Sequence, residues 1–169
     1  MFDGSEASER PIVRIEPWTQ GDLALLQKTL SDPEMTKHIG GPEGPESIAQ
    51  RQTGYEQENS RQFKIVEEGT GAATGWVGYW ELTWRDEQIF EIGWSVLPGF
   101  QGRGIGSMAT AQAIELARNE PTLRFLHAFP SVDNATFEGL PVLSQTSTRP
   151  GAWHRLSGYV GRQECSSET

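Results

Sequence analysis

Cysteine and basic charge are both scarce in this sequence. The only cysteine among the 169 residues is Cys165, so a disulfide framework within the monomer is excluded and a reducing, cytoplasmic compartment is favoured. Lysine and arginine number 14 against 23 acidic residues, which gives a net charge of -9. Such a chain repels nucleic-acid phosphates and anionic membranes, and it suits cationic ligands such as amines.

Long hydrophobic runs are also missing. No run approaches the roughly 20 apolar residues that a transmembrane helix needs, and the acidic N-terminus does not resemble a signal peptide. Residues 1–9 are expected to form a disordered tail. The histidines His38, His127 and His154 lack metal-ligand spacing, so we predict no metal site and treat all three as structural or surface residues.

The periodic patterns that are present predict a mixed α/β domain. Strands are expected at 12–16, 63–66, 74–82, 89–96 and 123–129, and helices at about 19–30, 47–59 and 105–120. The second helix reads as polar and solvent-facing. The strand at 89–96, the helix from 105 and the strand at 123–129 form one right-handed parallel crossover. Antiparallel strands therefore lead into a parallel pair.

A glycine-rich loop, QGRGIG at 101–106, separates the strand at 89–96 from the next helix. Backbone N–H groups at a helix N-terminus attract phosphate, and glycines allow close approach. The segment lacks the lysine of a P-loop, and Ser107 stands where a dinucleotide fingerprint needs its third glycine. A plain helix-start turn is the simpler alternative, but it does not need glycines at 99, 102, 104 and 106.

The loop resembles the [Q/R]-x-x-G-x-[G/A] motif of the GNAT (Gcn5-related) N-acetyltransferases through Gln101, Gly104 and Gly106. The preceding segment 92–98 resembles the family's strand before the loop. The segments 15–18, 22–23 and 32–35 resemble the branch of ribosomal-protein N-terminal acetyltransferases (RimJ/RimL-like). The resemblance spans about residues 10–136 and implies the GNAT fold, with a splayed pair of parallel strands.

The resemblance also implies where acetyl-CoA binds, with no metal involved. Its pyrophosphate is expected on the backbone of Gln101, Gly102, Arg103, Gly104, Ile105 and Gly106. Its pantetheine arm is expected along Trp94, Ser95 and Val96, whose amides can polarise the thioester carbonyl. Asn134 matches an asparagine that contacts the CoA arm in the family, and a helix cap is its alternative role.

Transfer to an amine requires a base, because the attacking nitrogen must be neutral. On the strand at 89–96, Glu91 shares one face with Gly93 and Ser95, while Phe90 and Ile92 lie on the other. Glu91 is therefore the candidate catalytic base, and a solvated sheet face is the alternative. The following aromatic residues either pack in the core or line an acceptor pocket: Trp76, Tyr79, Trp80 and Trp84.

The implied activity is direct transfer of an acetyl group from acetyl-CoA to a primary amine. The acceptor is a small-molecule amine or a protein N-terminus, with no nucleic-acid or membrane partner, and a homodimer is left open. The alternative is a non-catalytic acyl-CoA-binding domain or an inactive, truncated remnant.

The resemblance stops shortly after Asn134. Residues 10–136 form the expected GNAT domain, and residues 137–169 form an atypical C-terminal segment without a sustained period. Phe137 stands where the family has serine. A TTC codon for phenylalanine, shifted by one base, begins a serine codon, so we hypothesise a reading-frame change near residue 137. The fold would then be incomplete at its C-terminus and the segment poorly ordered.

Overall fold

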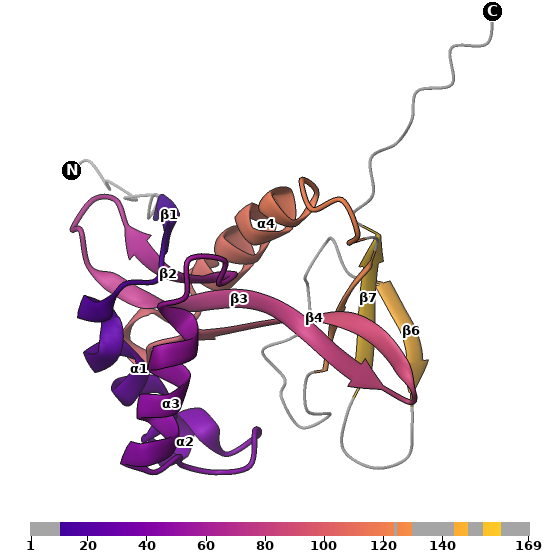
Figure 1. Cartoon of the computed structure of the whole chain (residues 1–169). Helices are drawn as coiled ribbons and strands as arrows, with labels where there is room; N and C mark the ends of the chain where they lie inside the picture. The colour runs from indigo at the N-terminus through magenta and orange to yellow at the C-terminus, as the bar shows by residue number, and fades with distance from the viewer. Residues whose placement is uncertain (1–10, 124, 130–143, 149–153, 160–169) are drawn as a thin grey trace, which may run out of the picture.

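The computed structural model describes residues 11–123, 125–129, 144–148 and 154–159. Their strands form one seven-stranded sheet in the order β1-β2-β3-β4-β5-β7-β6 (Figure 1). The strands are β1 (Val13–Pro17), β2 (Gln62–Glu67), β3 (Ala73–Trp84), β4 (Glu87–Val96), β5 (Phe125–Ala128), β6 (Ser144–Thr148) and β7 (His154–Tyr159). Only β4 and β5 pair in parallel among these neighbours. The predicted mixed sheet with a parallel pair is confirmed.

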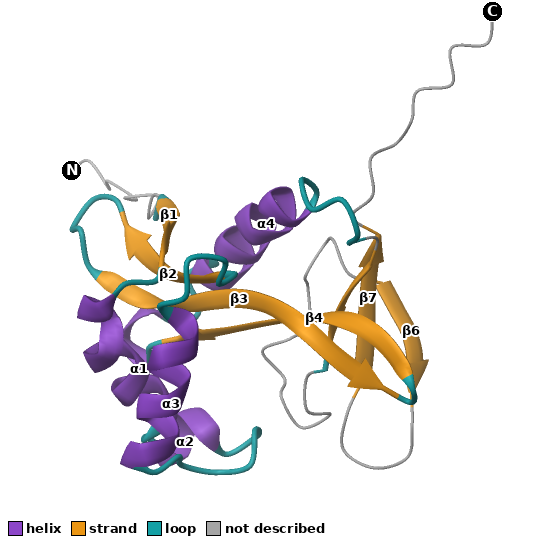
Figure 2. Ribbon diagram, in the orientation of Figure 1, coloured by secondary structure: helices purple, strands orange, loops and turns teal. Residues whose placement is uncertain are grey.

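Helices cover both faces of the sheet. They are α1 (Leu23–Leu30), α2 (Pro33–Thr36), α3 (Pro45–Tyr55) and α4 (Ile105–Ala117), with 3-10 turns η1 (Gln20–Asp22) and η2 (Pro98–Phe100). Helix α4 lies on one side of the sheet and α1 to α3 lie on the other (Figure 2). One hydrophobic core joins α4 to β3 and β4, and a second joins α1 and α3 to Trp76. The two faces of β4 therefore meet different surroundings.

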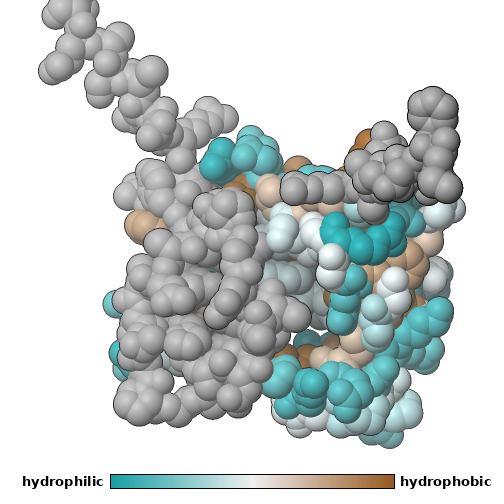
Figure 3. Space-filling model, turned by 180° about the vertical axis from the view of Figure 1, so that it is seen from behind, coloured by the Kyte–Doolittle hydropathy of each residue, from teal (hydrophilic) through white to brown (hydrophobic). Residues whose placement is uncertain are grey.

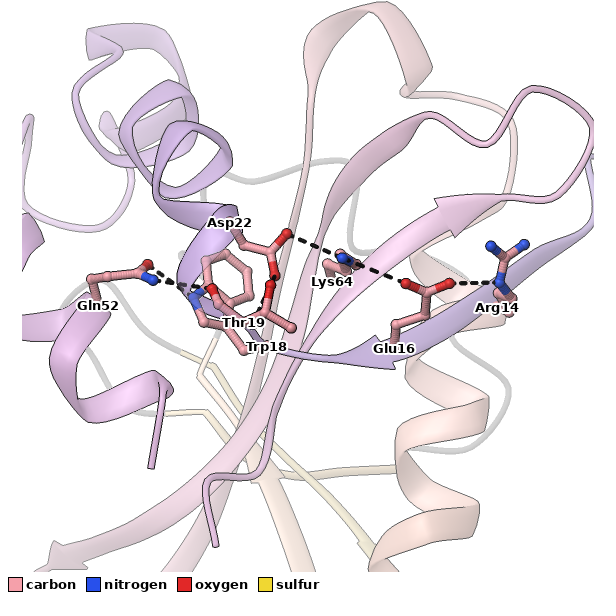
Figure 4. Close-up of polar contacts among 7 residues, drawn as sticks. All are labelled: Arg14, Glu16, Trp18, Thr19, Asp22, Gln52 and Lys64. Carbon is pink, nitrogen blue, oxygen red and sulfur yellow. Dashed lines mark hydrogen bonds and ion pairs between the residues drawn. The ribbon is translucent and has the colours of Figure 1, made fainter. Parts of the chain in front are cut away.

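A polar network fixes the chain where it enters α1 (Figure 4). The Asp22 carboxylate accepts hydrogen bonds from the Thr19 N–H at 2.8 Å and the Thr19 hydroxyl at 2.7 Å, as in a helix N-terminal capping pair. The Lys64 ammonium lies 3.2 Å from Asp22 and 3.5 Å from Glu16. These ion pairs tie β2 to β1 and to the start of α1.

Helix α3 is anchored by a buried glutamine. Gln52 is only 6% exposed. Its side chain accepts a hydrogen bond from the Trp18 indole at 2.9 Å and donates to the Thr19 carbonyl at 3.1 Å (Figure 4). Ile48, four residues earlier, is also buried. The predicted polar helix therefore faces solvent except at Ile48 and Gln52, and the buried side chain of Gln52 is satisfied by partners distant in sequence.

Helix α4 packs against the sheet through a stripe of mostly small residues. Ile105, Ala109, Ala113 and Ala117 are all buried against the sheet, and small side chains let the helix approach β3 and β4 closely. Leu116, by contrast, is 42% exposed.

The outer edge of β1 is covered by one side chain of α4. The Gln112 amide accepts a hydrogen bond from the Ile15 N–H at 3.1 Å and donates to the Val13 carbonyl at 2.8 Å. A primary amide can thus replace the two backbone contacts that another strand would make. This pair of bonds satisfies an edge strand and orients α4 over the sheet.

Two short strands lie where the sequence shows no regular period. Strand β7 pairs antiparallel with β5, from Phe125↔Tyr159 to Ala128↔Leu156, and β6 pairs antiparallel with β7. The composition of β6, SQTST, has no apolar alternation to reveal it. Backbone pairing with an available strand edge can form such a strand without that signal. The remaining C-terminal positions lie outside the described residues.

The described surface mixes polar and apolar residues. From behind, hydrophobic residues show as separate small areas among hydrophilic ones (Figure 3). The large hydrophobic residues that are most exposed in the described ranges come from separate parts of the chain: Ile12, Ile39, Leu116 and Phe125.

We predict that Gln112→Met destabilises the fold. Methionine preserves the length and helical preference of the side chain but cannot replace either backbone contact. Leaving a partly buried N–H and C=O unpaired should lower the free energy of unfolding by about 1–3 kcal/mol. Chemical denaturation with circular dichroism detection measures this loss.

The control is Gln57→Met, because Gln57 is exposed and bonds only locally, to the Thr53 carbonyl. It should change the unfolding free energy by less than about 0.5 kcal/mol. Equal effects of the two substitutions would show that the Gln112 contacts with β1 do not stabilise the sheet edge.

Candidate active site

Strands β4 and β5 pair over only two residues, in the middle of β4. β4 pairs with β3 continuously, from Trp84↔Glu87 to Gly75↔Val96. With β5 it forms only the pairs Phe90↔Leu126 and Glu91↔His127. Within the described ranges, β4 therefore borders no strand on its β5 side beyond Glu91. The sheet has a locally open edge in its middle.

The ladder directs part of the β4 backbone toward that edge. The Leu97 N–H donates to the Thr74 carbonyl at 2.8 Å, in the same register as the β3–β4 pairs. Because hydrogen-bonded residues alternate in an antiparallel pair, the N–H and C=O groups of Trp94 and Val96 point away from β3. The Val96 carbonyl there accepts a hydrogen bond from the Gln101 side chain at 2.8 Å, while Ser95 pairs with Trp76.

The loop from Gln101 to Gly106 enters α4 through two left-handed glycines. Gly102 has φ +73° and Gly104, the N-cap of α4, has φ +79°. The first helical bond runs from the Met108 N–H to the Gly104 carbonyl at 3.1 Å. No described group accepts a hydrogen bond from the N–H groups of residues 104–107. Together with the helix dipole they form a ready anion-binding site.

The third glycine of the loop brings α4 against β4. A Cβ atom on Gly106 would lie 3.2 Å from two atoms of the Trp94 indole, which is tighter than ordinary contact. Glycine therefore lets the first turn of α4 rest on the Trp94 ring. This contact places the helix N-terminus beside the open edge of β4.

Arg103 anchors the loop to the end of β2. Its guanidinium pairs with the Glu67 carboxylate, which also accepts a hydrogen bond from the Thr70 hydroxyl at 2.8 Å. The bonds from Thr70 and Arg103 lower the pKa of Glu67, and burial opposes them. The Arg103 side chain is thus directed toward β2, while its backbone belongs to the glycine loop.

Glu91 lies on the other face of β4, as predicted. Phe90, Trp94 and Val96 pack against the α4 core around Ile92. Glu91 is half-buried, and its Oε2 atom accepts a hydrogen bond from the Trp80 indole at 2.9 Å. Burial raises the pKa of Glu91 and the Trp80 bond lowers it, with burial prevailing. This environment favours proton acceptance more than a fully solvated face would.

The four aromatic residues of β3 divide between core and site. Trp76 is buried, with its indole N–H bonded to the Thr29 hydroxyl at 3.1 Å. Tyr79 is buried on the opposite face, where burial raises its pKa to about 12. Trp80 and Trp84 are half-buried on the face of Glu91, and the Trp84 ring lies 4.7 Å from that of Phe129.

Local patterns in the sequence do not reveal that Trp80 and His127 lie beside Glu91 in the sheet. Trp80 and Glu91 are cross-strand partners, and His127 is the β5 partner of Glu91. Both pairings follow from strand register. The β3–β4 turn has positive φ at Arg85 (49°) and Asp86 (65°), as in a type I′ hairpin. The sequence Arg-Asp lacks the glycine that usually reveals such a turn.

Of the predicted site residues, Asn134 lies outside the described residues. The others lie on β4 or in the glycine loop, around the open edge of β4. Across the described ranges, no three histidine, cysteine or acidic side chains gather closely enough to hold a metal ion. No helix in those ranges is long and apolar enough to span a membrane.

Solved structures share this fold. The acetyltransferase (GNAT family) from Bacillus anthracis aligns with a TM-score of 0.65 and 19% identity over 87% of this chain and 92% of that one. Aminoglycoside acetyltransferase AAC(6')-Ib in complex with coenzyme A aligns with a TM-score of 0.68 and 19% identity, over 88% of this chain and 95% of that one. Spermidine N-acetyltransferase from Vibrio cholerae, in complex with CoA and spermine, aligns with a TM-score of 0.67 and 14% identity, over 87% of this chain and 95% of that one. No curated protein matches the sequence.

The sequence also matches a family model, described as an acetyltransferase (GNAT) domain, over residues 13–138. This range contains β1 to β5, the glycine loop and α4, and its end agrees with the limit near residue 136 expected from the sequence. The match covers most of the chain, and the fold agrees with it. The chain therefore belongs to the GNAT acetyltransferase family and is an acyltransferase.

Proposed function

We propose that the protein transfers the acetyl group of acetyl-CoA directly to a primary amine. One observation carries this proposal: the anion-binding loop and Glu91 lie on opposite sides of the same open strand edge. The loop reaches that edge through the Gly106–Trp94 contact, and Glu91 precedes Trp94 by three residues. An anionic carrier and an amine acceptor can therefore meet at β4.

The loop residues fit a pyrophosphate. The backbone of Gln101–Gly106 would hold it, because N–H groups at the start of α4 are directed outward and the left-handed glycines leave them uncovered. Along Trp94–Val96 the pantetheine arm would lie as an added strand does, directed by the backbone of Trp94 and the N–H of Val96, while Ser95 between them stays paired with β3. Gln101 joins the two parts, since its side chain holds the Val96 carbonyl.

Glu91 would act as the general base. A primary amine is mostly protonated at neutral pH and cannot attack until it loses a proton. The Glu91 carboxylate takes that proton, directly or through one water. The amine nitrogen then bonds to the carbonyl carbon as the carbon–sulfur bond breaks and the sulfur leaves with the electron pair as a thiolate. The nitrogen loses its second proton as the amide forms, and that proton converts the thiolate to the thiol of CoA. Amides of the β4 edge can stabilise charge on the carbonyl oxygen.

The acceptor is proposed only as a primary amine. The names of two fold relatives refer to aminoglycosides and to spermidine, which are amine compounds. The RimJ/RimL-like resemblance near the N-terminus instead supports a protein N-terminus. A panel that contains polyamines, aminoglycosides and N-terminal peptides would separate these acceptors. Binding of acetyl-CoA without turnover on any of them would favour the non-catalytic alternative.

We also infer a reading-frame change in the gene near codon 137. The end of the family match at residue 138 supports it, as does Phe137 in the place of a serine. We expect the +1 frame after codon 136 to encode the remaining helix and strands of the family. Sequencing the DNA tests this, and early stop codons in that frame would rule it out.

We predict that Glu91→Gln lowers turnover by a factor of about 10²–10⁴, because glutamine cannot accept the proton. Acetyl-CoA affinity should not change, since Glu91 faces away from the loop. Thiol release and calorimetric titration measure the two quantities. Glu87→Gln, an exposed change on the same face of β4, is the control and should retain activity. Undiminished turnover in Glu91→Gln would remove Glu91 from the mechanism.

The pH dependence of kcat/KM should also report the ionisation of Glu91. Glu91 must be deprotonated to act, and burial raises its pKa above the ordinary value of 4.5. Activity should therefore fall as pH decreases through this raised pKa, so the acidic limb of kcat/KM should lie above pH 4.5. The limb should be absent in Glu91→Gln. A limb that persists there unchanged must belong to another group.

Gly104→Val should weaken acetyl-CoA binding. A β-branched residue at φ +79° is strained, and relief of the strain would reorient the amides at the start of α4. We expect the Kd to rise about tenfold, for a cost of about 1–3 kcal/mol. Gly99→Val is the control, since Gly99 has no positive φ and open space around it. Equal Kd values for the two variants would contradict the loop assignment.

A further inference from the structure

We propose that Trp80 is a positioning residue for Glu91. The indole N–H of Trp80 holds one carboxylate oxygen of Glu91 and leaves the other oxygen for the acceptor amine. This inference rests on the proposed role of Glu91 as the base. Trp80 does not itself need to touch the reacting atoms.

The geometry of the pair is defined by the sheet. Trp80 and Glu91 are directly opposed on β3 and β4, and the indole nitrogen lies 2.9 Å from Glu91 Oε2. Within the described part of the chain, no group donates a hydrogen bond to Glu91 Oε1. One oxygen is therefore fixed while the second can receive a proton. A base that is held in this way loses less conformational freedom when its substrate arrives.

Gly93 provides the space for this arrangement. A Cβ atom at position 93 would lie 2.7 Å from Cη2 of Trp80, so the indole ring rests directly over the glycine backbone. The nearest atom belongs to the far end of the ring, and the ring would have to move if a side chain were present. Gly93 is thus required because it has no side chain to collide with Trp80, whereas Gly104 is required for its positive φ angle.

A second tryptophan on the same face shows that this contact is specific. Trp76 lies four residues before Trp80, and its indole N–H donates to the Thr29 hydroxyl inside the α1 core. Both residues are tryptophans on one strand and face, but only Trp80 donates to a carboxylate. Trp76 is therefore a matched control for the loss of an indole N–H.

The indole bond also affects the charge of the base. A hydrogen bond to a carboxylate stabilises its ionised form, and burial opposes ionisation. For Glu91 the groups that face it from the neighbouring strands are Trp80 on β3 and the titratable His127 on β5. Loss of the indole N–H should raise the pKa of Glu91 further, because only the opposing effect of burial remains.

The decisive variant is Trp80→Phe, which retains a ring but removes the donor. We expect turnover to fall about tenfold and the acidic limb of kcat/KM to move about one unit to higher pH, as loss of a charge-assisted hydrogen bond would produce. The Kd for acetyl-CoA should stay the same. Trp76→Phe should lower the Tm without moving the limb. An unmoved limb in Trp80→Phe would overturn the inference.

A double-mutant comparison separates positioning from other roles. If Trp80 acts through Glu91, Trp80→Phe should have no further effect on turnover in the Glu91→Gln protein. The same tenfold loss in both backgrounds would overturn the inference. Wild-type turnover in Glu91→Gln alone would instead refute the role of Glu91, and with it this inference. The shift caused by Trp80→Phe should persist in a His127→Asn background, and its loss there would assign the limb to His127 and overturn the inference.

Gly93→Ala gives a second test that keeps the indole. The added methyl group should displace the Trp80 ring and move the acidic limb in the same direction as Trp80→Phe. In a Trp80→Phe background the substitution should add little to that shift. A limb that stays at its wild-type position in a folded Gly93→Ala protein would show that the ring position does not control Glu91.

Discussion

The register between β3 and β4 is the constraint on which the proposed site depends. It opposes Trp80 to Glu91 and directs the Trp94 and Val96 backbone toward the open edge. A slip of one residue would turn Glu91 into the core under α4 and bring Ile92 to the other face. The turn at Arg85 and Asp86 sets this register, although it contains no residue with a proposed chemical role.

The two faces of β4 perform separate tasks because different helices cover them. On the α4 face, Gly106 lets the helix N-terminus rest on Trp94, so the anion-binding amides have a fixed position relative to the strand. On the other face, Trp80 and Glu91 are only half-buried. A carrier and an acceptor can therefore reach one strand from opposite sides without competing for the same groups.

Local patterns in the sequence predicted β1 to β5, α4 and the glycine loop, because periodicity and glycine spacing record short-range structure. They also placed Glu91 opposite Phe90 and Ile92. They did not reveal that Gln52 is buried, because its partners Trp18 and Thr19 come from another element. The Trp80–Glu91 contact depends on register, and β6 depends on backbone pairing, so neither leaves a local pattern.

The environment of Glu91 balances two requirements of a base near neutral pH. Burial makes the carboxylate more basic, which helps it take a proton from an ammonium group, but burial also favours the protonated form that cannot act. Each pKa unit corresponds to about 1.4 kcal/mol, which is slightly less than the free energy of about 1.5–3 kcal/mol that a hydrogen bond to a charged group contributes. The single bond from Trp80 is thus large enough to offset a comparable part of the burial effect. Because it holds one oxygen only, it can preserve the charge of Glu91 without occupying the atom that accepts the proton.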